Sequence, residues 1–182
     1  NGKLTTEGLQ KAADFIRFCD AFSIPVLSLV SATGFDTTVA NEKSVAREAA
    51  RLIHTFADAS APKVTLLTGE AYGSAYLTMN SGHIGADLVY AWPTASVGMM
   101  PAENAVKIIY NDEIDASDDA QGLIAEKAAA YAALQTSPES AAGRGYVDAV
   151  IEPESTRQHL IAAFEMLYSK RAVRPSKKHS TL

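Results

Sequence analysis

The sequence is poor in the residues that build disulfides and metal sites, with one cysteine and four histidines in 182 residues. A single cysteine, Cys19, excludes an internal disulfide and any CxxC metal or redox motif. It falls on the apolar face of a predicted helix, which favours a small core side chain over a reactive thiol. No two histidines have metal-ligand spacing with a third ligand, so we predict no metal site.

Long apolar runs and clustered positive charge are also lacking. No window is long and apolar enough to cross a bilayer, and the first residues lack the apolar stretch of a signal peptide, so we expect a cytoplasmic protein without a membrane span. The formal net charge of −5 argues against a nucleic-acid partner. The one basic cluster, within 170–179, is more simply a solvated terminus than a site for CoA phosphates or a partner subunit.

The composition, 47% hydrophobic and 20% charged, predicts one folded domain over residues 1–182. Because the chain begins without Met and runs straight into a helical pattern, we expect it to be a fragment of a longer subunit. Helices are predicted at 5–22, 41–59, 102–110, 120–134 and 154–169, and strands at 26–30, 63–68, 87–92, 96–99 and 148–151. Strands that alternate with helices indicate an α/β fold with mainly parallel pairing.

Two local expectations concern the first strand and the residues that follow it. Val26–Val30 is a continuous apolar run with no strict alternation, which predicts a strand covered on both faces. Ser31–Ala40 is expected to be a polar loop around Gly34. A loop at the carboxyl end of a parallel strand is a common ligand site, although a glycine in a loop is most often a turn residue.

The stretch from Lys63 to Tyr76 is the most informative part of the chain. A buried strand is followed by a turn of small residues, predicted to start at Gly69, which feeds a short helix. Small side chains let a ligand approach the backbone, and the unpaired amides at a helix start attract an oxyanion. We therefore select the amides of Ser74 and Ala75, with Gly73 allowing the turn. Close packing alone explains such a turn equally well.

A second interpretation makes Ser74 a nucleophile. The residues around it lack the outer glycines of a G-x-S-x-G elbow. A hydrolase also needs a histidine and an orienting carboxylate, for which His83 with Asp87 or Asp148 are the available candidates. Four histidines supply such pairings by chance, so we disfavour covalent serine catalysis.

Four segments resemble the C-terminal domain of the biotin-dependent acyl-CoA carboxyltransferases. This family includes the β subunits of propionyl-CoA and acetyl-CoA carboxylases, methylmalonyl-CoA carboxyltransferase and the related decarboxylases. The segments occur in order along nearly the whole chain: FIRFCDAFSIP (15–25), PKVTLLTGEAYGSAYLTM (62–79), YAWPTASV (90–97) and GYVDAVIEPESTRQHLIAAFEML (145–167). The resemblance implies a crotonase-like (ClpP/crotonase) α/β fold, a superhelix of ββα units.

The resemblance also implies roles for individual residues. In the family, the two amides after the first glycine of a Tyr-Gly-(Gly/Ser)-Ala motif form an oxyanion hole, which places Ser74 and Ala75 in the catalytic site. The same resemblance implies that Gly34, Phe35 and Gly73 bind biotin. Tyr76 and Leu77 are then expected to line the substrate pocket.

The implied activity moves a carboxyl group between carboxybiotin and the α-carbon of an acyl-CoA, with backbone amides in place of a side-chain base. Biotin must arrive on a separate carrier domain or chain, the biotin carboxyl carrier protein, because the sequence has no Ala-Met-Lys-Met motif. The other implied partners are coenzyme A as acyl-CoA, an N-terminal carboxyltransferase domain, and further copies in a dimer to hexamer. The isolated fragment is expected to be inactive.

Departures from the family pattern leave the substrate open. The loop often written Asp-x-Pro-Gly-Phe is here Ser31–Phe35, without the acid and the proline, and Leu77 stands where propionyl-specific relatives tend to carry Asp. Two other functions stay as alternatives: a noncatalytic scaffold domain of crotonase fold, and an enoyl-CoA hydratase or isomerase. The latter needs a pair of glutamates near the turn, where Glu70 is the only acid.

Overall fold

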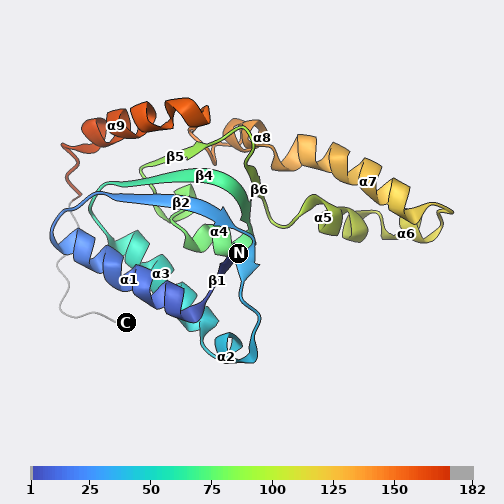
Figure 1. The fold of residues 1–182 in the computed structure, drawn as a ribbon, viewed down its shortest axis with the longest axis horizontal. Coiled ribbons are helices and arrows are strands. Elements are labelled where there is room, and N and C mark those ends of the chain that lie inside the picture. The colour runs from blue at the N-terminus through green and yellow to red at the C-terminus, as the bar shows by residue number, and fades with distance from the viewer. Residues whose placement is uncertain (1, 173–182) are drawn as a thin grey trace.

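Strand β4 (Lys63–Tyr72) is the centre of a five-stranded parallel sheet in residues 2–172, the part of the chain that the computed structural model describes (Figure 1). The other strands are β2 (Val26–Ala32), β5 (Leu88–Ala91), β6 (Ser96–Gly98) and β7 (Ala149–Val150). The order is β2-β4-β5-β7, and β6 also pairs with β4. The α/β class and the parallel pairing predicted from the sequence are confirmed.

One edge of β4 pairs with two strands in succession. Val64–Leu67 pairs with β5, and Glu70–Tyr72 pairs with β6. Between them, the backbone N–H of Trp92 donates to the carbonyl oxygen of Leu67 over 2.9 Å. Because β6 takes up the last three residues of β4, the carboxyl end of β4 is flanked by strands on both edges.

A second, two-stranded sheet was not predicted. Strand β1 (Lys3–Leu4) pairs in parallel with β3 (Gly34–Phe35). The prediction of a polar loop over Ser31–Ala40 is therefore wrong in part, because β2 runs to Ala32, β3 follows it, and α2 (Val39–Glu42) begins before the segment ends. Pairing with the chain's own N-terminal residues is a distant contact that no local pattern announces.

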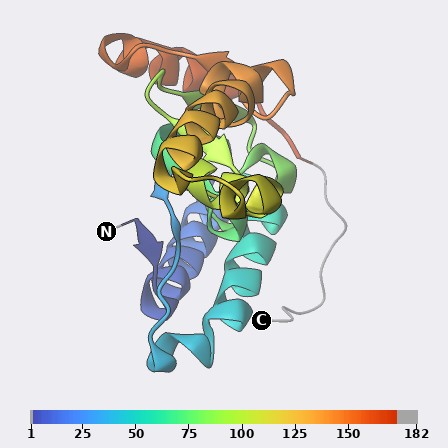
Figure 2. The same cartoon turned by 90° about the vertical axis from the view of Figure 1, so that its right-hand side faces the viewer.

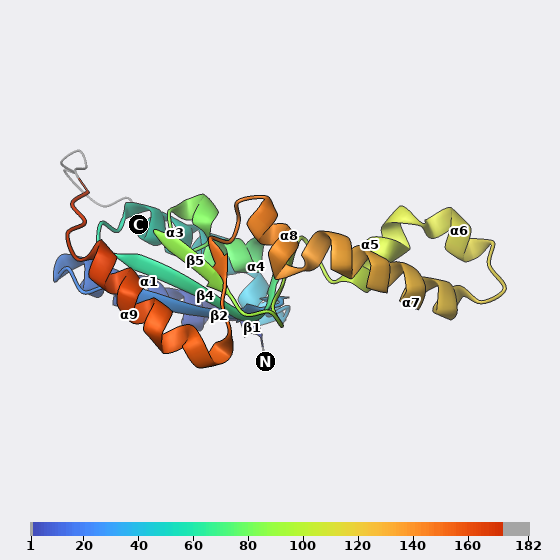
Figure 3. The same cartoon turned by 90° about the horizontal axis from the view of Figure 1, so that it is seen from above.

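Two helices cover one face of the sheet and one covers the other (Figures 1 and 3). On one face α1 (Thr6–Ala21) and α3 (Val45–Asp58) enclose a cluster of buried side chains that includes Leu9, Leu52 and Phe56. Cys19 is buried in this cluster, as the sequence predicted. On the other face lies α9 (Thr156–Leu167).

The expectation that β2 is covered on both faces is wrong. Its side chains alternate between buried and exposed, and Leu27 and Leu29 are 38% and 59% exposed. Within the described residues β2 is an edge strand, paired with β4 alone. A strand at the sheet edge receives less cover than the central strand, so its apolar run leaves one row of leucines open to solvent.

A helical extension projects from the sheet beyond the end of β6 (Figure 3). It consists of α5 (Ala102–Ile109), α6 (Asn111–Asp115) and α7 (Ala120–Tyr131). In Figure 2, which views the molecule from the end of this extension, the yellow and gold helices lie in front of the sheet. A π-helical turn, η2, then leads to α8 (Pro138–Gly143), which returns the chain to the sheet.

Helices were predicted close to where most of them occur, but α6 was missed. The remaining short elements are α4 (Gly73–Thr78), η1 (Gly82–Ile84), η2 (Ala132–Thr136) and η3 (Pro153–Ser155). No helix among the described residues is long and apolar enough to span a membrane. Most of the basic cluster noted in the sequence lies outside the described residues, apart from Lys170 and Arg171.

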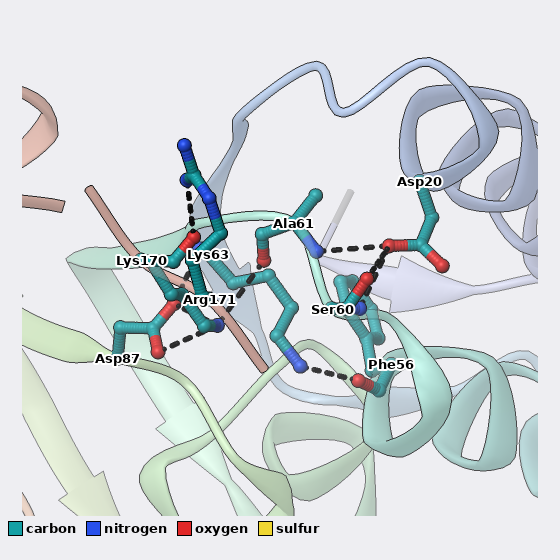
Figure 4. A network of polar contacts seen from close by, with 8 residues as sticks. All are labelled: Asp20, Phe56, Ser60, Ala61, Lys63, Asp87, Lys170 and Arg171. Carbon is teal, nitrogen blue, oxygen red and sulfur yellow. Dashed lines mark hydrogen bonds and ion pairs between the residues drawn. The ribbon is translucent and has the colours of Figure 1, made fainter. Parts of the chain in front are cut away.

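A network of polar contacts joins separate segments at the amino-terminal end of β4 (Figure 4). Asp20, near the end of α1, accepts hydrogen bonds from the backbone N–H groups of Ser60 and Ala61, at 2.7 and 2.8 Å, and from the Ser60 hydroxyl at 3.1 Å. Lys170 forms an ion pair with Asp87 at 2.8 Å and donates to the Ala61 carbonyl oxygen. These contacts tie α1, the loop before β4 and the segment after α9 together, at the end of the sheet away from α4.

Replacing Asp20 by Ala removes the acceptor of three hydrogen bonds and leaves two backbone donors without it. We expect the free energy of unfolding to fall by about 1–3 kcal/mol. The matched control is Asp14→Ala on the same helix, where an exposed carboxylate pairs with Arg51; its cost should stay below about 1 kcal/mol. Urea unfolding measures both, and equal effects of the two changes would contradict the role given to Asp20.

Candidate functional site: an amide turn beside a cavity

The chain reverses direction between β4 and α4 at one glycine. Tyr72 is extended, with φ −116° and ψ 138°, and Gly73 then has a φ of +55°. This left-handed backbone conformation agrees with the expectation that Gly73 allows the turn. The turn was predicted to begin at Gly69, which is wrong, because pairing with β6 keeps the chain in β4 as far as Tyr72.

The first residues of α4 carry backbone donors that no helix bond can satisfy. Helix geometry leaves the N–H groups of Ser74 and Ala75 without an intrahelical acceptor. No described residue outside α4 accepts a hydrogen bond from either group. Ser74 is exposed, whereas Ala75 is almost completely buried in the core of the sheet. Two neighbouring unpaired amides at a rigid turn form a suitable site for an oxyanion.

A cavity of about 470 Å³ opens beside this turn. Of the residues singled out from the sequence, Gly73, Ser74, Tyr76 and Leu77 line it. The opposite walls come from segments distant in the sequence. Val97, Gly98 and Met99 come from β6 and the residue after it, and Tyr131, Gln135 and Thr136 come from the end of α7 and from η2. His83, Ala141, Arg144 and Tyr146 complete the lining. The cavity therefore lies where the sheet meets the helical extension.

Gly34 and Phe35 are placed differently. They form β3, which contacts α4. Phe35 packs against the cluster enclosed by α1 and α3 and against a second buried cluster that includes Ala75, and neither Gly34 nor Phe35 lines the cavity. The two residues thus contact α4 without reaching the cavity, and their contact with biotin stays a prediction.

Tyr76 is buried in the core, and its hydroxyl has no hydrogen-bond partner among the described residues. Burial disfavours the phenolate and raises the pKa of Tyr76 to about 12. Its side chain is therefore neutral at physiological pH and cannot act as a base. Its ring contributes an apolar wall.

Several lining residues were not identified from the sequence as parts of a site. Tyr131, Gln135, Arg144 and Tyr146 are far along the chain from the turn and reach it only because α8 returns from the extension. The rings of His83 and Tyr146 lie against each other with centroids 4.9 Å apart. No spacing in the sequence links these residues to Gly73, so no local signal could have found them.

The cavity lacks the side chains that the competing reactions need. No aspartate or glutamate is among the described residues that line it, so the acid and base pair of a hydratase is missing from this wall. A serine nucleophile requires a histidine that hydrogen-bonds its hydroxyl. The histidine hydrogen bond seen among the described residues joins His159 to the Ser155 carbonyl oxygen and does not involve Ser74. The described residues also contain no cluster of three or more His, Cys, Asp or Glu that could hold a metal.

A larger hollow, about 930 Å³, lies along α9 beside Trp92 and Pro25. It is wide and contains none of the residues selected from the sequence. Size alone does not identify a site, and the smaller cavity is the one that adjoins unpaired backbone donors.

The parallel sheet, the strand-to-helix amide turn and the cavity beside it define a crotonase-like carboxyltransferase domain. Comparison with solved structures supports this class: the transcarboxylase 12S crystal structure, a hexamer assembly with methylmalonyl-coenzyme A and methylmalonic acid bound, matches 98% of this chain and 35% of its own with 41% identity and a TM-score of 0.93. A geranyl-CoA carboxylase β subunit from P. aeruginosa matches 99% of this chain and 35% of its own with 26% identity and a TM-score of 0.81.

The family follows from the sequence comparison. The model of the carboxyl transferase domain matches residues 1–182, and the chain belongs to that family. It is 44% identical over its whole length to the propionyl-CoA carboxylase carboxyltransferase subunit of Haloferax mediterranei. It is 42% identical over 98% of its length to the methylmalonyl-CoA carboxyltransferase 12S subunit of Propionibacterium freudenreichii. The chain spans 35% and 34% of the length of these two relatives.

The turn should tolerate no side chain at Gly73. A Cβ there would lie 3.0 Å from the carbonyl oxygen of Met99, in a backbone region that L residues with branched side chains avoid. We expect Gly73→Val to lower the free energy of unfolding by about 2 kcal/mol or more. Urea unfolding measures the loss.

Gly143→Val is the matched control, because a Cβ at Gly143 would meet no heavy atom within 4 Å and its φ is not positive. Its cost should be below about 1 kcal/mol. Comparable stability of the two variants would show that the turn accepts a side chain and that the strain argument is wrong.

Proposed function

We propose that this chain is the biotin-side half of a carboxyltransferase that moves a carboxyl group between carboxybiotin and the α-carbon of an acyl-CoA. The observation that carries the proposal is the pair of unpaired amides, Ser74 and Ala75, at a turn that borders a cavity without acidic side chains. Membership of the carboxyl transferase family supports the same function.

The residues of the cavity suit a reaction that needs anion stabilisation rather than a side-chain base. Biotin, when bound, carries the carboxyl group on a urea nitrogen, and release of that group leaves negative charge on the urea oxygen. The Ser74 and Ala75 amides would donate to this oxygen, and each such donor is typically worth about 3 kcal/mol in the transition state. Tyr76 and Leu77 supply apolar surface beside the amides that excludes water.

The second substrate and the remaining partners belong to the proposal as well. The solved 12S relative binds methylmalonyl-coenzyme A, which supports an acyl-CoA as the substrate. Since the chain spans about a third of its relatives, we propose that an N-terminal carboxyltransferase domain supplies the acyl-CoA oxyanion hole. The biotin arrives on a biotin carboxyl carrier protein.

Self-association is proposed on two grounds. The 12S relative is a hexamer. Ile108 and Ile109 on the helical extension, and Leu134 in η2 directly after it, are 58–69% exposed, which suits a surface that is covered in a dimer or hexamer. The Ala-rich helix α7 belongs to the same extension.

Substrate choice within the acyl-CoA class is assigned to Leu77. Its side chain is 36% exposed at the wall of the cavity, where it presents an apolar surface to the substrate. Gly34 and Phe35 act on biotin indirectly, through the position of α4. We disfavour a noncatalytic scaffold with this fold, because a scaffold role does not account for unpaired amides beside a cavity.

Ser74 should act through its amide and not its hydroxyl. In the full-length enzyme we expect Ser74→Ala to retain carboxyl transfer within about tenfold, roughly 1.4 kcal/mol. Ser74→Pro removes the N–H in the first turn of a helix, where proline is tolerated, and should cost about two orders of magnitude in kcat. Transfer of label from carboxybiotin to an acyl-CoA measures both. A well-folded Ser74→Ala enzyme that loses several orders of magnitude would end this interpretation.

These 182 residues alone should not turn over carboxybiotin with an acyl-CoA, because the oxyanion hole for the thioester is assigned to another domain. The measurement is steady-state transfer by the chain alone and by the full-length subunit at equal concentration. Activity of the isolated chain close to that of the full-length subunit would contradict the two-domain arrangement.

A further inference from the structure

Arg144 places a positive charge on the wall of the cavity that contains the amide turn. It follows α8 directly, is exposed, and lines the same cavity as Gly73 and Ser74. It is the only arginine or lysine among the described residues that line this cavity. Any anion that reaches the turn therefore meets one cationic side chain.

The charge of Arg144 is held in place but not neutralised. Its Nη2 donates to the side-chain oxygen of Gln135 at 2.5 Å and to the carbonyl oxygen of Leu134 at 3.4 Å, and its Nη1 donates to the Gln135 carbonyl oxygen at 3.5 Å. All three acceptors are neutral. No ion pair joins Arg144 to a carboxylate within residues 2–172.

The hydrogen-bonding pattern leaves the guanidinium able to bind a further group. A guanidinium has five N–H donors in a planar fork that matches a carboxylate. Three donor contacts to described residues account for part of this capacity, and two of them are 3.4 Å or longer. The oxygen atoms of Leu134 and Gln135 orient the Arg144 side chain, and its remaining N–H groups can still donate to an anion.

From this arrangement we propose that Arg144 binds the carboxylate of the group being transferred and so distinguishes carboxylated from uncarboxylated substrates. The inference rests on the proposed function, because only carboxyl transfer brings a carboxylate to the turn. Free biotin and a simple acyl thioester have no carboxylate at the reacting atom, whereas carboxybiotin and a carboxylated acyl-CoA both do. Arg144, as a fixed cation in the cavity that contains the amide turn, therefore recognises both carboxybiotin and the carboxylated acyl-CoA.

The test compares four Michaelis constants in the full-length enzyme with its usual partners. The forward direction uses carboxybiotin and propionyl-CoA, and the reverse direction uses biotin and methylmalonyl-CoA. Arg144→Gln should raise KM for the two carboxylated substrates about tenfold, because a charge-assisted hydrogen bond is lost. KM for biotin and propionyl-CoA should stay within about twofold, since neither presents a charge to Arg144. A rise for only one of the two carboxylated substrates would contradict the proposal that Arg144 recognises both.

Gln135→Glu separates charge from shape. It preserves the size of the side chain but puts a carboxylate oxygen where the neutral oxygen now contacts Arg144. If the free charge of Arg144 binds substrate, this variant should raise the same two KM values as Arg144→Gln. If Arg144 merely holds η2 in place, Gln135→Glu should strengthen the contact and leave all four KM values unchanged, which would overturn the inference.

Lys11→Gln is the control for net charge, because Lys11 is an exposed residue of α1 outside the cavity. It should leave all four KM values within about twofold. Equal increases for carboxylated and uncarboxylated substrates in Arg144→Gln would also refute the proposal.

Calorimetric binding of methylmalonyl-CoA and propionyl-CoA needs no turnover. Suppose that the wild-type enzyme shows no carboxyl transfer, but binds methylmalonyl-CoA more tightly than propionyl-CoA, and that Arg144→Gln removes this difference. The proposed function would then be rejected, and the carboxylate site would be retained. Unchanged discrimination in this variant would reject the site itself.

Discussion

Pairing of β6 with the last three residues of β4 is the contact from which the geometry of the site follows. Because Glu70–Tyr72 is committed to the sheet, the chain can turn only at Gly73, whose φ of +55° points α4 back beneath the sheet. The carbonyl oxygen of Met99, after β6, would lie 3.0 Å from a Cβ at Gly73, so a side chain there would be crowded as well as strained by the positive φ. The strand that lengthens β4 therefore also decides where the unpaired amides of α4 are presented.

The chemistry that this arrangement supports depends on fixed partial charges. Ser74 and Ala75 contribute backbone donors, and the cavity wall contributes one full positive charge at Arg144 without an acidic neighbour in the described lining. Fixed donors in a partly enclosed cavity stabilise developing negative charge without reorganising. The neutral phenol of Tyr76, with its raised pKa, keeps the adjoining surface apolar. A site of this kind contains few of the acids and bases by which active sites are usually recognised.

The outer surfaces carry a separate constraint. Phe15 and Phe18 on α1, and Phe22 directly after it, are each more than half exposed, and so is Leu29 on β2. The ends of the helical extension expose further apolar side chains. Surfaces of this kind are uncommon in proteins that act as monomers, which supports the proposed self-association. Side chains on both faces of β4 are nevertheless buried, with Thr65 and Leu67 on one face and Val64 and Leu66 on the other.

By itself the sequence determined the α/β class, most helices and strands and a turn that uses Gly73, because periodicity, helix starts and glycine geometry are local properties. It also selected the amides of Ser74 and Ala75, whose role is a proposal. The resemblance over four segments added the family. Tertiary structure alone decided that β4 continues to Tyr72, that β2 is an edge strand with exposed leucines, and that Gly34 and Phe35 pair with the N-terminal residues. It also brought Gln135, Arg144 and Tyr146 to the turn through the return of α8. These outcomes depend on contacts between segments far apart in the chain, which no local pattern encodes.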